Sequence, residues 1–336
     1  MKIAIVNSSS FGVHFPIHIK KLSTFGSVER IDVSTDITGG EFARRLEGIE
    51  VIIATVTPIY DREFFNKNKS LVMISRHGVG VDNIDIASAT ESGVIVTRVP
   101  GRMERDSVAE HAIALLFTVA RKVVPSVESA KKGRWSERAR FLGREINGKK
   151  VGILGIGEIG SRIAEILTEG FRTKVFAYDP NLKPEEIKLR GAEPVELEYL
   201  LKECDIIFLQ SPLTKENYHM LGEKEFSLMK NDVVIVNTAR GELIDEKTLI
   251  KYLKKGKIGG IGMDVVEGEP IDERHPLLKF ENVIITPHTA AYTKESLKRM
   301  GDKLVEDVRR ISKKEIPEFV VNQDVLKKEN RAGINL

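Results

Sequence analysis

The sequence has very little cysteine. Its 336 residues include one cysteine, Cys204, so no disulfide can form within the chain. A lone thiol is typical of proteins that work in a reducing compartment. We therefore predict a cytoplasmic location. We also expect Cys204, which lies between a helical stretch and a strand, to be a small buried residue.

An excess of charge of one sign is also lacking. The chain has 52 Lys and Arg against 49 Asp and Glu, a formal net charge of +3. This balance provides no electrostatic attraction to nucleic acid or to an anionic membrane surface. The first ten residues, MKIAIVNSSS, contain one lysine and a short apolar run, which is typical of neither a signal peptide nor a membrane span. We expect no nucleic-acid or membrane partner.

What the chain does contain is a repeated alternation of short apolar runs and helical stretches. Its length suffices for two domains that each have a core. Alternation of this kind predicts parallel sheets with crossover helices. The expected strands are 3–6, 28–33, 51–54, 71–74 and 94–96 in the first part, and 151–154, 174–178, 205–209, 233–237, 260–264 and 283–286 in the second. Helices are expected at 106–123, 246–255 and 292–311, and 319–322 can form a last strand.

A glycine motif follows the strand at 151–154. Gly155, Gly157 and Gly160 form a G-x-G-x-x-G that opens a helical pattern. Gly155 would permit a tight turn, Gly157 would let the backbone approach a pyrophosphate, and Gly160 would let the helix lie against the strand. The free N–H groups of the helix N-terminus would then bind the phosphates. The motif predicts a dinucleotide site, although such turns also occur for packing alone.

An aspartate stands at the end of the next strand. Asp179 lies about twenty residues beyond the glycines, where a carboxylate can accept hydrogen bonds from the ribose hydroxyls of an adenosine. A 2′-phosphate would be repelled there, so NAD is preferred over NADP. The alternative is a strand-end turn before Pro180.

Three chemically reactive side chains follow successive late strands. Arg240, Glu269 and His288 come after the strands at 233–237, 260–264 and 283–286. Ligands of open parallel sheets bind beyond the carboxyl ends of the strands. Arginine suits a carboxylate, histidine can exchange a proton near neutral pH, and a glutamate would favour the protonated imidazole. Singly, each could be a surface or turn residue; together they predict one catalytic crevice.

Glycines also follow a strand in the first part of the chain. Gly78, Val79 and Gly80 come directly after the strand at 71–74 and its short extension. Backbone N–H groups in such a loop can bind an anion. An ordinary strand-to-helix turn is the alternative.

Five segments and one aspartate together resemble the D-isomer-specific 2-hydroxyacid dehydrogenases. The segments are GIGEIG, QSPLTKENYHML, VNTARGELID, MDVVEGEP and TPHTAAYT, and the aspartate is Asp179. The resemblance covers essentially the whole chain and is strongest from 100 to 293. It implies an NAD-dependent oxidoreductase that interconverts a D-2-hydroxyacid and its 2-ketoacid.

The same resemblance implies an architecture. The fold class would be α/β, with two Rossmann-like, doubly wound parallel-sheet domains. A substrate domain formed by 1–99 and 290–336 would receive, as an insertion, an NAD-binding domain at 100–289. The protein would be a homodimer assembled through the NAD-binding domains, and no metal site is expected.

Roles for individual residues are also implied by the resemblance. Arg240 would bind the substrate, His288 would be the acid/base, and Glu269 would be its partner carboxylate. The loop of Gly78, Val79 and Gly80 would bind the substrate carboxylate together with Arg240. Besides the three glycines and Asp179, cofactor contacts are implied at Glu158, Ile159, Ser211, Pro212, Asn217, Thr238, Ala239, Arg240 and Asp264. Gln210 departs from the family pattern, because many members have histidine there.

The sequence leaves the substrate open. The segments PLTKENYHM and HTAAYT favour a D-lactate-like substrate, whereas phosphoglycerate and glyoxylate or hydroxypyruvate are alternatives. A second class of function is an NADH-sensing binding protein without turnover, which would have no need of a proton donor. A third, a methyltransferase that uses an adenosine cofactor, would have one nucleotide domain and no such group of three residues.

Overall fold

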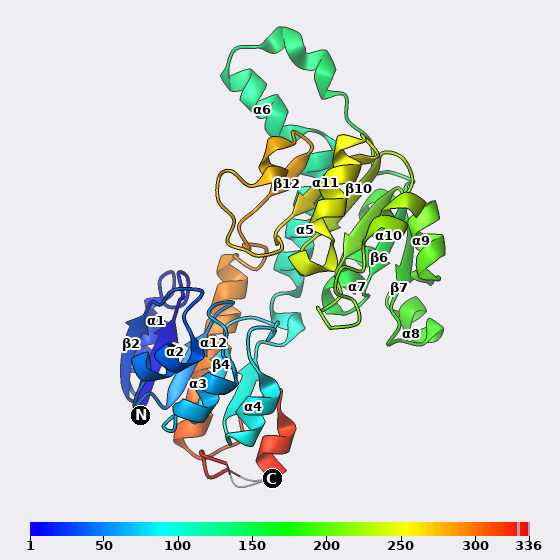
Figure 1. The fold of residues 1–336 in the computed structure, drawn as a ribbon. Helices are drawn as coiled ribbons and strands as arrows, with labels where there is room; N and C mark the ends of the chain where they lie inside the picture. The colour runs from blue at the N-terminus through cyan, green and yellow to red at the C-terminus, as the bar shows by residue number, and fades with distance from the viewer. Residues whose placement is uncertain (328–329, 335–336) are drawn as a thin grey trace. The chain divides into compact units, whose positions relative to one another are not determined.

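The computed structural model describes residues 1–327 and 330–334. The chain divides into two compact units (Figure 1), one formed by Met1–Glu104 with Thr293–Leu336 and the other by Arg105–Tyr292. We call them the outer unit and the inserted unit. Residues 328–329 and 335–336 of the predicted substrate domain lie outside the described residues.

The outer unit contains a parallel sheet of five strands in the order β2-β1-β3-β4-β5. Its central strand β3 has the sequence VIIA with every residue buried, as expected where helices cover both faces of a parallel sheet. The strands are β1 (Lys2–Val6), β2 (Ser27–Ile31), β3 (Val51–Ala54), β4 (Met73–Arg76) and β5 (Ile95–Arg98). The helices are α1 (Pro16–Leu22), α2 (Gly39–Arg45), α3 (Arg62–Lys67), α4 (Ile86–Glu91) and α12 (Lys294–Ser312), with short 3-10 helices η1 (Gly101–Met103) and η5 (Gln323–Lys327).

The inserted unit contains a parallel sheet of seven strands in the order β12-β11-β10-β9-β6-β7-β8. The strands are β6 (Lys150–Leu154), β7 (Lys174–Tyr178), β8 (Glu193–Pro194), β9 (Ile206–Leu209), β10 (Val233–Asn237), β11 (Ile258–Met263) and β12 (Val283–Ile285). The helices are α5 (Arg105–Ala120), α6 (Val123–Lys131), α7 (Glu158–Phe171), α8 (Pro184–Leu189), α9 (Leu197–Glu203), α10 (Glu223–Leu228) and α11 (Glu246–Lys254), with η2 (Trp135–Phe141), η3 (Gly241–Leu243) and η4 (Pro276–Lys279).

The direction of strand addition reverses at β6 in this sheet. β7 pairs with one side of β6, and β9 pairs with the other. Beyond the carboxyl ends of two such strands, the loops diverge and leave a crevice that binds ligands in open α/β sheets. The loops after β6 and β9 are therefore the first place to look for a nucleotide site.

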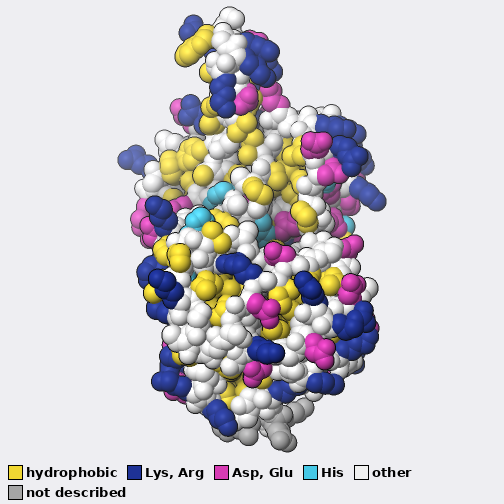
Figure 2. Space-filling view, turned by 90° about the vertical axis from the view of Figure 1, so that its left-hand side faces the viewer, with side chains coloured by type: hydrophobic (Ala, Val, Ile, Leu, Met, Phe, Trp, Pro, Cys, Tyr) yellow, Lys and Arg dark blue, Asp and Glu magenta, His cyan; other side chains and the backbone are white. Residues whose placement is uncertain are grey.

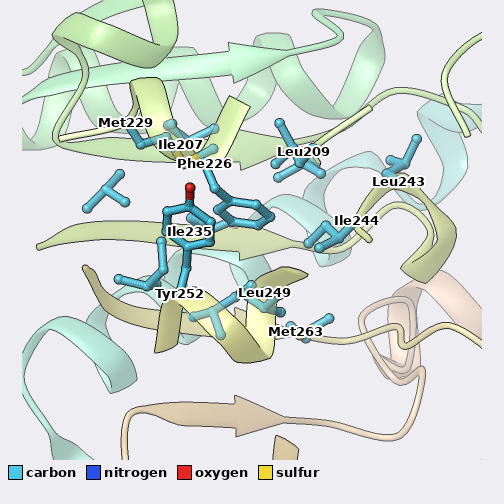
Figure 3. Close-up of a cluster of buried hydrophobic side chains, with 14 of the residues drawn as sticks. Ile207, Leu209, Phe226, Met229, Ile235, Leu243, Ile244, Leu249, Tyr252 and Met263 are labelled. Carbon is cyan, nitrogen blue, oxygen red and sulfur yellow. The ribbon is translucent and has the colours of Figure 1, made fainter. Parts of the chain in front are cut away.

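Alternation along the strands builds a core on each face of the seven-stranded sheet. In β9, Ile207 and Leu209 belong to one buried cluster, whereas Ile206 and Phe208 belong to the other. Figure 3 shows the first cluster, where the rings of Phe226 and Tyr252 stack with centroids 5.5 Å apart. The buried clusters on both faces hold the sheet, and with it the ends of its strands, in place.

The helix expected at 106–123 is α5, which ends three residues earlier than predicted, and the helix α6 that follows it was not predicted. Lys122 has a left-handed backbone conformation, with φ of 50°, so α5 ends at Ala120 and α6 begins at Val123. In Figure 1, α6 and the segment after it, which includes η2, extend away from the rest of the inserted unit. We call residues 123–142 the arm.

The strand predictions omitted one strand and included one segment that is not a strand. β8 was not predicted because it has only two residues, Glu193 and Pro194, and two residues show no alternation. The segment 319–322 is not a strand: Val320 forms an isolated antiparallel bridge to Thr97, and Val321 N–H donates to the Val96 carbonyl at 2.8 Å.

The predicted fold class, with one parallel-sheet domain inserted into another, is confirmed. Cys204 is fully buried next to α9 and β9, as expected, and burial raises the pKa of its thiol to about 12. Among the described residues, no helix is long and apolar enough to cross a membrane.

Candidate functional site

The glycine motif forms the tight turn between β6 and α7. Gly155 has φ of 90°, and a Cβ there would lie 2.6 Å from the backbone nitrogen of Ser211. At Gly160, a Cβ would lie 2.4 Å from the Gly155 carbonyl oxygen. Both glycines are thus required by close packing, of the turn against the loop after β9 and of α7 against the turn.

Gly157 differs from the other two glycines because a Cβ there would meet nothing within 4 Å. It is the N-cap residue of α7, and it has no side chain that could accept a hydrogen bond from the first N–H groups of the helix. The open space and these N–H groups form a cradle for an anion. The arrangement fits the pyrophosphate of a dinucleotide, with Glu158 and Ile159 contributing the first backbone N–H groups of the helix.

Asp179 lies beside this turn. One of its carboxylate oxygens accepts a hydrogen bond from Ile156 N–H at 3.1 Å, and the other accepts one from Asn181 N–H at 3.1 Å. On the opposite side, the Arg190 guanidinium donates to the Ile156 carbonyl at 2.8 Å. The Asp179 carboxylate and the Arg190 guanidinium thus hold the middle residue of the turn. A carboxylate at the end of the second strand suits the ribose of a dinucleotide.

The loop after β9 packs on the glycine turn and is joined to the end of β10. Gln210, the residue that departs from the family pattern, donates from its amide nitrogen to the Thr238 hydroxyl at 2.8 Å. Asn217 closes the loop by donating to the Pro212 carbonyl at 2.7 Å and accepting from Thr214 N–H at 2.7 Å. The predicted cofactor residues Ser211, Pro212 and Asn217 therefore share one structured loop.

The segment after β10 places Arg240. Asn237, which is fully buried, donates from its side chain to the Arg240 carbonyl at 2.7 Å and accepts from Ala239 N–H at 3.0 Å. A Cβ on the next residue, Gly241, would lie 2.1 Å from the backbone nitrogen of Glu267. The Arg240 loop thus packs directly on the segment that leads to Glu269.

Glu269 and His288 form the closest contact of the predicted catalytic residues. The Nδ1 atom of His288 lies 2.5 Å from Oε1 of Glu269, and both side chains are about one-third exposed. Glu269 lies in the loop after β11 and His288 in the loop after β12. The two residues are 19 positions apart in sequence. The contact leaves the other ring nitrogen, Nε2, available for proton exchange with a ligand.

Asp264 has a structural function that its predicted role did not include. It is 1% exposed, and its carboxylate accepts hydrogen bonds from the Thr286 hydroxyl at 2.6 Å and from the N–H groups of Thr289 and Ala290 at 2.8 and 2.7 Å. Burial alone would raise the pKa of Asp264, but hydrogen bonds from His111, Thr286 and the backbone outweigh it and lower the pKa below its ordinary value. Asp264 is thus an ionised anchor for the loop that carries His288.

Gly78, Val79 and Gly80 lie in the outer unit and follow β4. Gly78 has φ of 148°, and a Cβ there would lie 2.8 Å from the Arg76 guanidinium. Arg76 is 4% exposed and donates to the His77 carbonyl at 2.6 Å. The loop therefore crosses directly over a buried cation.

Sequence reasoning missed several residues that support the site. Asn237 and Thr286 stand within the motifs that were recognised, beside Arg240 and His288, but a motif does not show which of its residues face inward. His111 could have been found from its spacing, because a polar residue four positions before Leu115 lies on the same, buried face of α5. Another histidine–carboxylate pair was also missed: Nε2 of His219 lies 3.0 Å from both oxygens of Glu267. Among the described residues, no group of three or more potential ligands could hold a metal ion.

Comparison with known proteins identifies the family. The family model described as "D-isomer specific 2-hydroxyacid dehydrogenase, NAD binding domain" matches residues 113–290. The chain is 38% identical to a glyoxylate reductase from Thermococcus litoralis over 92% of this chain and 94% of that protein. It is also 38% identical to a D-3-phosphoglycerate dehydrogenase from Archaeoglobus fulgidus, over 84% of this chain and 53% of that protein.

A solved structure agrees with this result. The D-lactate dehydrogenase from Aquifex aeolicus, in complex with NAD and lactic acid, superimposes with a TM-score of 0.84 at 32% identity, covering 95% of this chain and 99% of that one. The chain therefore belongs to the D-isomer-specific 2-hydroxyacid dehydrogenases, a family of NAD-dependent oxidoreductases.

Proposed function

We propose that this protein reduces glyoxylate, or a 2-ketoacid of similar size, to the 2-hydroxyacid with NADH, and that Arg240, Glu269 and His288 carry the reaction. The observation that supports the chemistry most directly is the 2.5 Å contact between His288 and Glu269. Glyoxylate is favoured because the glyoxylate reductase relative is 38% identical over 92% of this chain. The phosphoglycerate dehydrogenase relative matches 84% of this chain, and the D-lactate dehydrogenase is 32% identical. The D-lactate-like substrate predicted from the motifs is the first alternative.

The residues of the inserted unit fit NAD. The open position at Gly157 and the uncapped N-terminus of α7 suit the pyrophosphate, and the Asp179 carboxylate beside the turn suits a ribose without a 2′-phosphate. When bound, the cofactor supplies or accepts the hydride. The remaining predicted contacts, at Ser211, Pro212, Asn217, Thr238, Ala239 and Asp264, are part of this proposal.

The protein's own residues then act on the substrate. Protonated His288 donates its Nε2 proton to the oxygen that becomes the hydroxyl, since its Nδ1 atom is engaged by Glu269. The Glu269 carboxylate stabilises the imidazolium and fixes the orientation of the ring. Arg240 offers a planar pair of donors to the substrate carboxylate and polarises the carbonyl. In oxidation, His288 accepts the proton.

We also propose that the protein is a homodimer assembled through the arm of the inserted unit. Apolar side chains are exposed along the arm, with 76% exposure at Trp135 and 82% at Leu142. Figure 2 shows yellow hydrophobic side chains on this projection and at its base. A groove of about 410 Å³ beside α6 is lined in part by Val124, Phe141 and Leu278. Exposed apolar side chains of this kind are typical of an interface between subunits.

The experiment that tests the proposed reaction is a substrate panel. NADH oxidation would be measured with glyoxylate, hydroxypyruvate, pyruvate and 3-phosphohydroxypyruvate at equal concentrations. We expect the highest kcat/KM with glyoxylate. A preference for pyruvate would establish the D-lactate alternative, and a preference for the phosphorylated acid would contradict both. Binding of NADH without turnover of any acid would instead indicate the NADH-sensing protein.

A further inference from the structure

His111 lies over the carboxyl end of β11 because α5 packs closely on that strand. Gly262 has no side chain, and a Cβ there would lie 2.9 Å from Cβ of Leu115. Asp264 follows Gly262 by two residues, and His111 precedes Leu115 by four, one turn earlier on the same face of the helix. His111 therefore lies next to Asp264, one helical turn away from the contact between Leu115 and Gly262.

The hydrogen bonds between His111, Thr286 and Asp264 all donate toward the Asp264 carboxylate. The Thr286 hydroxyl donates its single proton to Oδ1 of Asp264 at 2.6 Å. Nε2 of His111 lies 2.9 Å from the same hydroxyl oxygen and 3.5 Å from Oδ1 of Asp264. Because the hydroxyl proton is already used, Nε2 of His111 must carry a proton and donate it. His111, Thr286 and Asp264 thus form a chain of donors that ends on a buried carboxylate.

The end of this chain determines the conformation of the loop after β12. The Asp264 carboxylate accepts from the N–H groups of Thr289 and Ala290, and its backbone carbonyl accepts from His288 N–H at 2.9 Å. His288 itself has φ of 54°, in the left-handed region that residues with a side chain rarely adopt. A conformation of this kind persists only where the surroundings enforce it.

We propose that His111 is a positioning residue for the acid/base His288, acting through the Thr286 hydroxyl and the Asp264 carboxylate. The inference rests on the proposed function in one respect, the role of His288. A helix that only had to pack on β11 would have an apolar residue at this position, as it does at Leu115. Instead, the side chain is a nitrogen donor that is one-quarter exposed and aimed at the group holding the loop.

Matched substitutions separate the hydrogen bond from the packing. His111→Phe keeps a planar ring but removes the donor, whereas His111→Gln keeps an N–H that reaches the position of Nε2. Thr286→Val and Thr286→Ser make the same comparison one step along the chain of donors. Glu110→Gln, on the exposed face of α5, is the control for substitution in this helix.

We expect His111→Phe and Thr286→Val each to lower kcat about tenfold, as a small misplacement of a catalytic group does, while KM for NADH changes less than about twofold. The Gln and Ser variants should recover most of the turnover. The double variant His111→Phe/Thr286→Val should be no slower than either single variant, because both break the same chain. Wild-type turnover in His111→Phe, or multiplication of the two single effects, would overturn the proposal.

A second measurement does not depend on turnover. In proton NMR spectra, the His288 ring proton shared with Glu269 should give a strongly downfield resonance in the wild type and in His111→Gln, and that resonance should broaden or disappear in His111→Phe. If the wild type reduced no ketoacid, the proposed function would fail while this test of loop positioning would still apply. A resonance that is unchanged in His111→Phe would contradict the positioning role, and the thermal unfolding midpoint would show whether each variant is folded.

Discussion

At the scale of single residues, the assignment of the acid/base depends on His288. Replacing it with glutamine keeps the approximate size of the side chain and a hydrogen-bonding group but removes the ring nitrogen that exchanges a proton with the substrate. We expect kcat to fall by roughly 10²- to 10⁴-fold, the usual contribution of general acid–base catalysis. The affinity for NADH, measured by fluorescence titration, should change little.

Glu269→Gln should lower kcat in the same direction, because an uncharged partner no longer stabilises the imidazolium. Glu273→Gln, an exposed glutamate four residues further on, is the matched control and should behave like the wild type. Equal turnover of His288→Gln and wild type would remove His288 from the mechanism.

Asp264 makes a prediction about pH. Its pKa is lower in the folded protein than the value of about 3.9 expected in the unfolded chain. The ionised carboxylate therefore contributes stability that is fully present above the unfolded pKa and is lost as the pH falls through the folded pKa. Asp264→Asn should lower the free energy of unfolding by about 1–3 kcal/mol at neutral pH, since buried donors lose a charged acceptor.

The difference in unfolding free energy between wild type and Asp264→Asn should stay constant above about pH 5 and shrink below about pH 4. Denaturant titrations at a series of pH values would measure it, with Asp32→Asn, an exposed aspartate of the outer unit, as the control. A difference that grew on acidification would show that Asp264 is not the ionised anchor inferred from its contacts.

At the scale of elements, the β6–α7 turn contains two glycines whose substitution by alanine should have different effects. Gly157 has φ of −73° and open space around its Cβ position, so Gly157→Ala should fold with unchanged or slightly increased stability. The added methyl group would occupy the space proposed for the pyrophosphate, and we expect KM for NADH to rise about tenfold or more. Steady-state kinetics and thermal unfolding of one preparation measure both effects.

Gly155→Ala serves as the contrasting variant. Its φ of 90° and the nearby Ser211 backbone leave no room for a methyl group, so the main effect should be loss of stability. If Gly157→Ala bound NADH as tightly as the wild type, the turn would not be the pyrophosphate site.

The elements also show where pattern recognition from sequence ends. The short, continuous apolar runs predicted β3, β6 and β10 well, because strands buried on both faces need apolar residues at nearly every position. The break at Lys122 and the two-residue β8 were missed because a change of backbone direction or a short edge pairing leaves no periodic signal.

At the scale of the whole molecule, the arm predicts self-association. Sedimentation should give the mass of two chains of 37.6 kDa each. Replacing Val124 and Val127, both 44% exposed on α6, with aspartate should shift the protein toward the monomer, because charge would be buried at the interface. Val13→Asp, at a 53% exposed position of the outer unit, is the control. A monomeric wild type at micromolar concentration would contradict the dimer.

The sequence by itself determined the fold class, the nucleotide turn and the three polar groups after the late strands. These features follow from local rules: apolar runs specify strands, glycine spacing specifies the turn, and parallel strands place their carboxyl ends at one edge of the sheet. Only the tertiary structure decided which of the polar groups meet. The contact between His288 and Glu269, and the chain from His111 through Thr286 to Asp264, join residues up to 175 positions apart, and such pairings depend on how helices and strands pack rather than on any local pattern.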